Sequence, residues 1–278
     1  VNGQPVVVSG GFSTSGFGTL VMNDPADVLA VQGDVGFHGG STSDLLTAGV
    51  LSVNGDFTAT DTVSDRSFFA SGEHTVLFSG VGTQTIRFVQ QFASPLADQF
   101  HHVQASNAVT VRPATPIAVA GSLLVLGNGV FDVNGQAMSA GSVATLQGGV
   151  LRMTTSGGVL DVLGDASFGG GSESGQLSDG ILRIHGTFSQ FGTPVGGGSF
   201  EGASLHVTEF TGTSPQTISF EDPIGSHFGH VRFSNTGPGG VTFLSDAFAA
   251  GQLQTSPLRA VKRGCGHGHP LRVFGLDG

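Results

Sequence analysis

The most constraining feature of this 278-residue sequence is a long internal repeat. Residues 28–34 (VLAVQGD) return about 131 positions later as residues 159–165 (VLDVLGD), and residues 51–57 (LSVNGDF) return as residues 182–188 (LRIHGTF). The opening VNGQ at 1–4 matches VNGQ at 133–136, so residue 1 lies inside a repeat and we expect the chain to be a piece of a longer array. A fixed period restricts the fold before any single element is assigned. The sequence therefore predicts two repeats, 1–132 and 133–257.

Within each repeat, short runs of alternating apolar residues are separated by clusters of Gly, Asn and Ser. Leu51, Val53 and Phe57 show this alternation, which is typical of strands with one buried face. The 47 glycines supply the positive φ that tight corners need, and Asn in the pairs at 54–55 and 134–135 is the next best residue there. Only 11% of the residues are charged, too few for the outer faces of helices. The predicted fold is all-β.

Two arrangements of these strands are compatible with the pattern. The regular return of Leu-x-Val-x-Gly favours stacked coils of about 20 residues each, in which identical positions lie above one another. We therefore predict a parallel, right-handed β-helix, or β-solenoid, built of the two long repeats. The Asn-Gly pairs could instead close two-residue hairpins, so an antiparallel β-sandwich pair is the alternative.

The charge balance excludes some partners. The formal net charge of −10 leaves no surface that could neutralise phosphates, so we expect neither nucleic acid nor an anionic membrane as a partner. No apolar run approaches the 18 or more residues of a membrane span, so none is predicted. The single cysteine, Cys265, allows no disulfide within the chain.

Two adjoining stretches carry a family resemblance. Residues 100–111 (FHHVQASNAVTV), continued by residues 118–135 (AVAGSLLVLGNGVFDVNG), resemble the strand repeats of large bacterial cell-surface and autotransporter-passenger β-solenoids. The similarity extends over nearly all of residues 1–257. It implies an extracellular or cell-surface location, and its repeats carry adhesion, spacing and enzymatic roles alike.

The repeat pattern stops near Pro257. Residues 258–278 contain four of the chain's ten lysines and arginines together with Cys265. This change of composition predicts an atypical basic tail of non-native origin, with a basic capping tail as the alternative. An uncapped last coil exposes an open edge, so end-to-end or edge association of chains is a further expectation.

The densest polar cluster is residues 221–230 (EDPIGSHFGH), which supplies carboxylates and imidazoles within one loop. Such groups could act as general acid and base, or hold a cation that activates water. The matching place in the first repeat contains Asp98 and His101. The candidate catalytic residues are therefore Glu221, Asp222, His227, His230, Asp98 and His101, with a solvated turn as the alternative.

Some histidines and aspartates recur between the repeats, and others do not. His74 matches His206 and His102 matches His230, so these predict a scaffold role, whereas His38, His101, His185 and His227 have no counterpart. Asp34 and Asp165 follow matched glycines and are candidate metal ligands. Calcium is the cofactor that such aligned oxygen ligands would suit, and ordinary turn aspartates are the alternative.

Two functions from different classes follow. The first is a non-enzymatic segment of an extracellular bacterial surface protein with a structural or adhesive role, whose partner is a glycan or another surface ligand. The second is a hydrolase of an ester, lactone or glycan, assisted by calcium. The body contains no Lys, and no Arg recurs between the repeats, which argues against a lyase of acidic polysaccharides.

Overall fold

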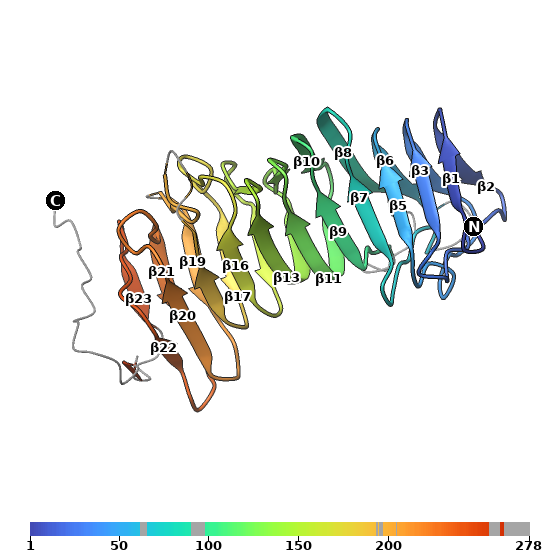
Figure 1. Cartoon of the computed structure of the whole chain (residues 1–278). Helices are drawn as coiled ribbons and strands as arrows, with labels where there is room; N and C mark the ends of the chain where they lie inside the picture. Colours follow the sequence, from blue (N-terminus) through green and yellow to red (C-terminus); the bar gives the residue numbers. More distant parts are fainter. Residues whose placement is uncertain are drawn as a thin grey trace. The chain divides into compact units, whose positions relative to one another are not determined.

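The computed structural model describes residues 1–61, 66–89, 98–192, 194, 197–203, 205–255 and 262–263. These residues form strands, turns and bends, and they include no helix. The chain divides into two compact units, Val1–Asp132 (unit 1) and Val133–Gly278 (unit 2). Each unit is built of strands that lie side by side (Figure 1).

Unit 1 contains the first half of the strands: β1 (Pro5–Val8), β2 (Phe12–Ser15), β3 (Val28–Val31), β4 (Val35–His38), β5 (Val50–Val53), β6 (Phe57–Thr60), β7 (Thr75–Phe78), β8 (Gly82–Val89), β9 (His102–Ala105), β10 (Val109–Pro113), β11 (Ile117–Val125) and β12 (Val130–Asp132). The odd-numbered strands pair in the order β1-β3-β5-β7-β9-β11. The even-numbered strands pair in the order β2-β4-β6-β8-β10-β12. Every one of these pairings is parallel.

Unit 2 contains the other strands: β13 (Ala137–Leu146), β14 (Val150–Arg152), β15 (Val159–Val162), β16 (Ala166–Gly169), β17 (Ile181–Ile184), β18 (Phe188–Gln190), β19 (Val207–Phe210), β20 (Gln216–Phe220), β21 (His230–Phe233), β22 (Val241–Phe243), β23 (Leu253–Thr255) and β24 (Lys262–Arg263). The start of β13 pairs with β15, and the row continues strand by strand through β17, β19 and β21 to β23. The end of β13 pairs with β16, and the row continues strand by strand through β18, β20 and β22 to β24. These pairings are parallel as well.

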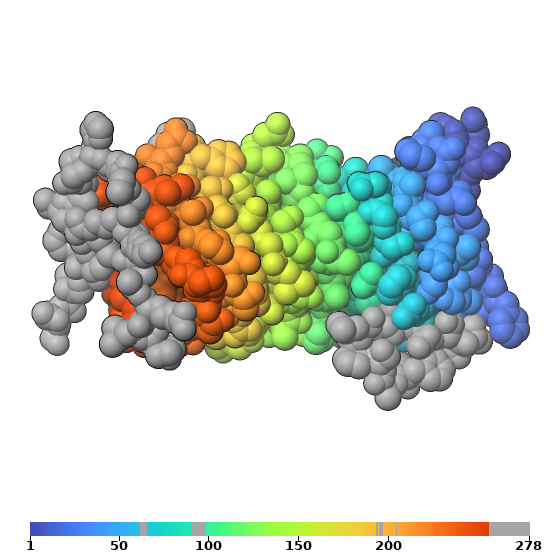
Figure 2. Space-filling model, turned by 90° about the horizontal axis from the view of Figure 1, so that it is seen from below, coloured from blue at the N-terminus to red at the C-terminus, as the bar shows by residue number. Residues whose placement is uncertain are grey.

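Each unit is therefore a parallel β-solenoid, as predicted, and not an antiparallel sandwich. Its coils vary in length: Val103 pairs with Leu123, 20 residues on, whereas Thr75 pairs with His102, 27 residues on. A third side of the coil is held by single parallel bridges, such as Met22 to Leu46. The gradual change of chain colour along each unit in Figure 2 follows this stacking of successive coils.

The core of each unit is filled by columns of Val, Leu and Phe. Alternation places every second strand residue inside, so Leu51 and Val53 are fully buried while Ser52 is half-exposed. Two phenylalanines are central. Phe57 packs in unit 1 against the rings of Phe37, Phe68, Phe78, Phe88 and Phe100. Phe188 packs in unit 2 against the rings of Phe168, Phe200, Phe210, Phe220 and Phe228.

The Asn-Gly pairs at 54–55 and 134–135 differ in the reason for their glycine. Asn134 and Gly135 both have positive φ, 55° and 71°, as expected at a tight corner. Asn54 and Gly55 do not have positive φ, so the expectation was wrong there. Gly55 is required by close packing, because a Cβ at this position would lie 2.5 Å from the carbonyl carbon of Gly33 in the preceding coil.

The predicted tail, 258–278, lies outside the described residues except for β24, which pairs with β22. In the part of the chain that the structure describes, no helix has the length and apolar character needed to cross a membrane. Two predictions stay predictions: the right-handed winding of the coils, and the division of the chain into repeats at 1–132 and 133–257.

Candidate functional site

The carboxylates of segment 221–230 are bonded to loop backbone. Glu221 is exposed and its Oε2 accepts a hydrogen bond from the N–H of Gly192 at 2.9 Å. Oδ1 of Asp222 accepts hydrogen bonds from the N–H groups of Ile224 and Gly225 at 3.3 and 3.1 Å. This second arrangement is the local turn closure that aspartates commonly make. Both carboxylates therefore stabilise the loop that follows β20.

The two imidazoles of the segment lie apart in the coil. His227 forms a parallel bridge with Glu201, and His230 begins β21. Nδ1 of His230 accepts a hydrogen bond from the N–H of Gln252 at 2.7 Å. Within the described residues, no hydrogen bond or ion pair joins either imidazole to Glu221 or Asp222. The structure thus places these four candidates in one loop region without bringing them into a shared polar contact.

The first-repeat candidates are separated by burial. Asp98 is buried, and its Oδ1 accepts a hydrogen bond from the N–H of Phe68 at 2.9 Å. His101 is half-buried, and its ring centroid lies 4.4 Å from that of His102. Burial lowers the pKa of His101, His102 lowers it further, and Glu73 opposes the shift. Asp98 serves the backbone of the preceding coil, whereas His101 belongs to a small group of imidazoles.

The candidate metal ligands occupy equivalent corners of the two units. Oδ1 of Asp34 accepts a hydrogen bond from the N–H of Asp56 at 2.8 Å, and Oδ1 of Asp165 accepts one from the N–H of Thr187 at 2.7 Å. Each aspartate therefore links its corner to the next coil. Among the described residues, no group of three or more His, Cys, Asp or Glu is arranged to hold a metal ion. Calcium at these corners stays a prediction.

Matched glutamines make the same links more deeply inside the coils. Nε2 of Gln84 donates to the carbonyl oxygens of Val53 (2.9 Å) and Gly55 in unit 1. Nε2 of Gln216 donates to the carbonyl oxygens of Ile184 (2.9 Å) and Gly186 (2.8 Å) in unit 2. Both side chains are buried, so these bonds satisfy backbone groups that water does not reach. Residues that recur in both repeats serve the scaffold here.

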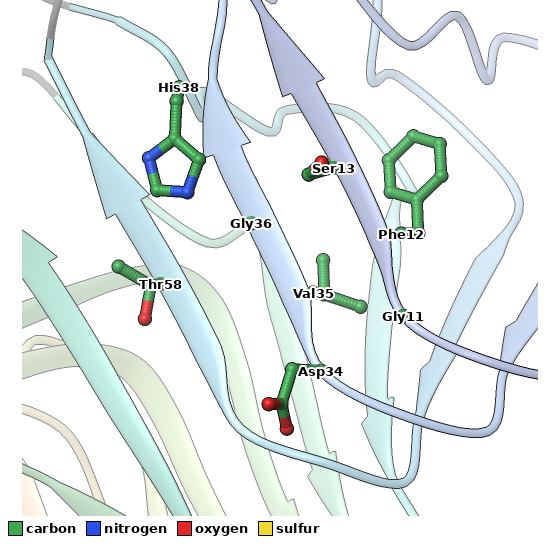
Figure 3. A pocket seen from close by; sticks show the side chains of 8 residues that line it. All are labelled: Gly11, Phe12, Ser13, Asp34, Val35, Gly36, His38 and Thr58. Carbon is green, nitrogen blue, oxygen red and sulfur yellow. The ribbon is translucent and has the colours of Figure 1, made fainter.

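A surface hollow in unit 1 contains residues that the sequence analysis did not choose as a site. It has a volume of about 420 Å³ and lies over the outer face of β2, β4 and β6 (Figure 3). We name it the Gly36 hollow, and its lining residues are Gly11, Phe12, Ser13, Asp34, Val35, Gly36, His38 and Thr58. The signals in the sequence were Asp34, a candidate metal ligand, and His38, which has no counterpart in the second repeat.

The Gly36 hollow arises from a missing side chain in an outward row. Ser13 pairs with Gly36, and Gly36 pairs with Thr58, so the three positions form one column across the sheet. A Cβ at Gly36 would lie 2.6 Å from Nε2 of His38. The glycine therefore admits the His38 ring, which lies over this position in the column and buries Gly36.

The Gly36 hollow does not have the geometry of a Ser-His-Asp triad. Asp34 and His38 are four residues apart on an extended chain, which places their Cα atoms about 13 Å apart at about 3.3 Å per residue. Figure 3 shows the carboxylate of Asp34 and the imidazole of His38 at opposite ends of the hollow. A triad needs the imidazole within hydrogen-bond reach of both partners. The arrangement therefore cannot relay a proton along these three residues.

Comparison with known proteins finds no matching family model, no matching curated protein and no matching solved structure.

Proposed function

We propose that this chain is a segment of an extracellular bacterial surface β-solenoid with a structural and adhesive role. The observation that carries the proposal is that polar side chains form hydrogen bonds between successive coils. Asp34 and Gln84 show this in unit 1, and Asp165 and Gln216 repeat it in unit 2. Side chains bound in this way hold the coils in register and are not arranged as reacting groups.

The outward rows support the same proposal. In unit 2, Ser167 and Ser189 share a hydrogen bond of 2.9 Å between their Oγ atoms, and Oγ1 of Thr217 donates to Oγ1 of Thr187 at 3.3 Å. Parallel strands place such rows at a regular spacing of about 4.8 Å. A regular hydroxyl-bearing sheet is suited to contact with an extended ligand.

An adhesion assay with the full chain tests this function. The protein is coupled to beads, and bead retention under flow is measured on surfaces that bear glycans or extracellular-matrix proteins. We expect retention above that of uncoated beads. In parallel, the free protein is assayed on neutral ester, lactone and glycan substrates, with and without a chelator. Turnover that is lost in His227→Ala, together with no bead retention, would contradict the proposal and favour the alternative, a hydrolase at segment 221–230.

A further inference from the structure

The chain contains four Asn-Gly pairs, at 2–3, 54–55, 128–129 and 134–135. Such a pair can cyclise, because the glycine has no side chain to hinder attack of its backbone nitrogen on the carboxamide carbon of the asparagine. The attack requires this nitrogen to give up its proton and to turn toward the carboxamide. A hydrogen bond that holds the glycine N–H opposes both steps. The hydrogen bonds of the four glycines therefore distinguish pairs that the dipeptide sequence does not.

Two of the pairs are held by backbone carbonyls. The N–H of Gly55 donates to the carbonyl oxygen of Gly33 at 3.0 Å, and the N–H of Gly129 donates to the carbonyl oxygen of Leu126 at 3.0 Å. The carboxamide of Asn54 is held as well, since both its Oδ1 and its Nδ2 are bonded to neighbouring side chains. Neither glycine nitrogen can attack without first losing a hydrogen bond.

The other two pairs lie in one turn that the chain builds twice. The sequence VNGQ occurs at 1–4 and again at 133–136. Both residues of each pair have positive φ: 64° at Asn2 and 69° at Gly3, 55° at Asn134 and 71° at Gly135. Because sequence and backbone are matched in the two copies, any difference in the reactivity of the two asparagines must come from their surroundings.

The two turns face different residues of the next coil. The residues after the turns pair in the same register with β3 and β15, so positions 27 and 158, which precede these strands, are equivalent. In unit 1, Oδ1 of Asp27 accepts a hydrogen bond from the N–H of Gly3 at 2.6 Å. In unit 2 the place is taken by Gly158, where a Cβ would lie 3.4 Å from Cα of Gly135. Within the described residues of unit 2, the N–H of Gly135 donates to no group.

Asp27 protects its turn by charge as well as by the hydrogen bond. Desolvation raises the pKa of Asp27, but hydrogen bonds from the N–H groups of Gly3, Asp24 and Asn23 hold it below its usual value, so the side chain is an anion at neutral pH. Attack on a carboxamide places negative charge on its oxygen, and a neighbouring anion disfavours this charge. The turn of unit 2 has no carboxylate at the equivalent place.

We propose that Asn134 is a site of spontaneous deamidation and that the other three Asn-Gly pairs are protected from it. The nitrogen of Gly135 bonds to Cγ of Asn134 and loses its proton, the Cγ–Nδ2 bond breaks, and the carboxamide nitrogen leaves as ammonia. Water then opens the succinimide at one of its two carbonyls, which gives aspartate or isoaspartate. Either product adds a carboxylate to the turn, and isoaspartate also lengthens the main chain by one carbon. This modification does not depend on the adhesive function.

Peptide mapping by mass spectrometry tests the assignment. The folded full chain is incubated at pH 8 and 37 °C, and the mass gain at each asparagine is followed with time. We expect Asn134 to deamidate at least about tenfold faster than Asn2, because losing a hydrogen bond to a charged acceptor slows a reaction by about this factor. In urea, where the turns are lost, the two copies of VNGQ should deamidate at similar rates.

Exchanging the facing residues tests the cause. Gly158→Asp installs the carboxylate of unit 1 and should slow deamidation at Asn134 by about tenfold, whereas the matched control Gly158→Ala adds a Cβ without an acceptor and should leave the rate near that of wild type. Asp27→Ala should raise the rate at Asn2. Circular dichroism establishes that each variant is folded. Equal rates at Asn2 and Asn134 in the folded wild type would overturn the proposal, as would a rate at Asn134 that Gly158→Asp leaves unchanged.

Discussion

His74 and His206 occupy matching places in the cores of the two units, and both imidazoles are buried. The ring of His74 lies 6.2 Å from that of Phe68, and the ring of His206 lies 6.3 Å from that of Phe200. Burial lowers the pKa of His74 to about 4, and His101 and His102 contribute to the shift. Burial also lowers the pKa of His206 to about 4, against an opposing hydrogen bond with the carbonyl of Asp179. Both residues are therefore neutral in the folded chain at pH 7.

These histidines should make the fold sensitive to acid. Between pH 6.5 and 4 the unfolded chain binds their protons and the folded chain does not, so stability falls as pH falls through this window. The effect is up to about 3 kcal/mol for each residue. We expect the double variant His74→Leu, His206→Leu to lose less free energy of unfolding than wild type between pH 7 and 4.5. Urea unfolding followed by circular dichroism measures this. An unchanged pH dependence would contradict this expectation.

Glu173 should have the opposite pH dependence. It is fully buried, and burial raises its pKa well above the usual value, although the N–H of Leu151 and the charge of Arg152 oppose the shift. The folded chain then holds a proton that the unfolded chain releases, so stability falls as pH rises above about 4.5. Glu173→Gln should therefore be more stable than wild type at pH 8, with a smaller difference at pH 4.5. The same urea midpoints test this, and a variant less stable than wild type at pH 8 would refute it.

At the scale of elements, the outward faces of equivalent strands differ most. In unit 2 one outward column forms a charge ladder, which runs through Asp161, Arg183, Glu209 and Arg232 on strands β15, β17, β19 and β21. Nε of Arg183 lies 3.1 Å from Oε2 of Glu209, and Nη1 of Arg232 lies 3.8 Å from Oε1. The corresponding column of unit 1 has Ala30, Ser52, Leu77 and Gln104. Strands with equivalent pairing thus carry a column of charged side chains in unit 2 and a column of uncharged side chains in unit 1.

Removing the central charge of this ladder should cost more than replacing the ladder. Glu209→Leu leaves Arg183 and Arg232 facing each other across one strand without their shared partner, which we expect to cost about 2 kcal/mol. The triple variant Arg183→Ser, Glu209→Leu, Arg232→Gln installs the unit 1 residues and should recover most of this loss. Urea unfolding of the three proteins checks the order. A triple variant less stable than Glu209→Leu would show that the unit 1 solution does not transfer.

At the scale of the whole molecule, the two units use the same central aromatic packing. Phe57 and Phe188 are fully buried, and each packs against the equivalent set of rings in its own unit. Such solenoids gain stability from contacts between neighbouring coils. The central rings therefore carry equivalent parts of the stability of each unit.

Matched substitutions at these rings should have matched costs. Phe57→Ala and Phe188→Ala should each lower the free energy of unfolding by about 3–5 kcal/mol, because a large cavity replaces the ring. The costs should add in the double variant, since the two rings share no packing partner among the described residues. Circular dichroism is the appropriate probe, because the chain has no Trp or Tyr. Costs that differ several-fold would show that the two cores are not equivalent.

The sequence by itself determined which residues face inward. Alternation at Leu51 and Val53, with glycine at the corners, follows from the local geometry of an extended chain, and stacked parallel coils are the arrangement that buries such runs throughout a repeat. The recurrence of His102 and His230 in both repeats predicted a scaffold role, and Nδ1 of each accepts a backbone hydrogen bond from the next coil. The unmatched His185 also bonds between coils, to Oδ1 of Asp161 at 2.9 Å, so the contrast with unmatched histidines does not hold.

Only the tertiary structure decided which outward residues meet. Ser13, Gly36 and Thr58 are more than 20 residues apart in sequence, and they share a column because the intervening loops set the register of β2, β4 and β6. Coil length varies with these loops, so a sequence period cannot align outward side chains to within one residue. Inward positions tolerate a shift of two residues, because alternation brings another apolar residue inside, whereas a shift of one would turn the apolar residues outward. The packing of His38 over Gly36, between two particular hydroxyls, tolerates neither shift.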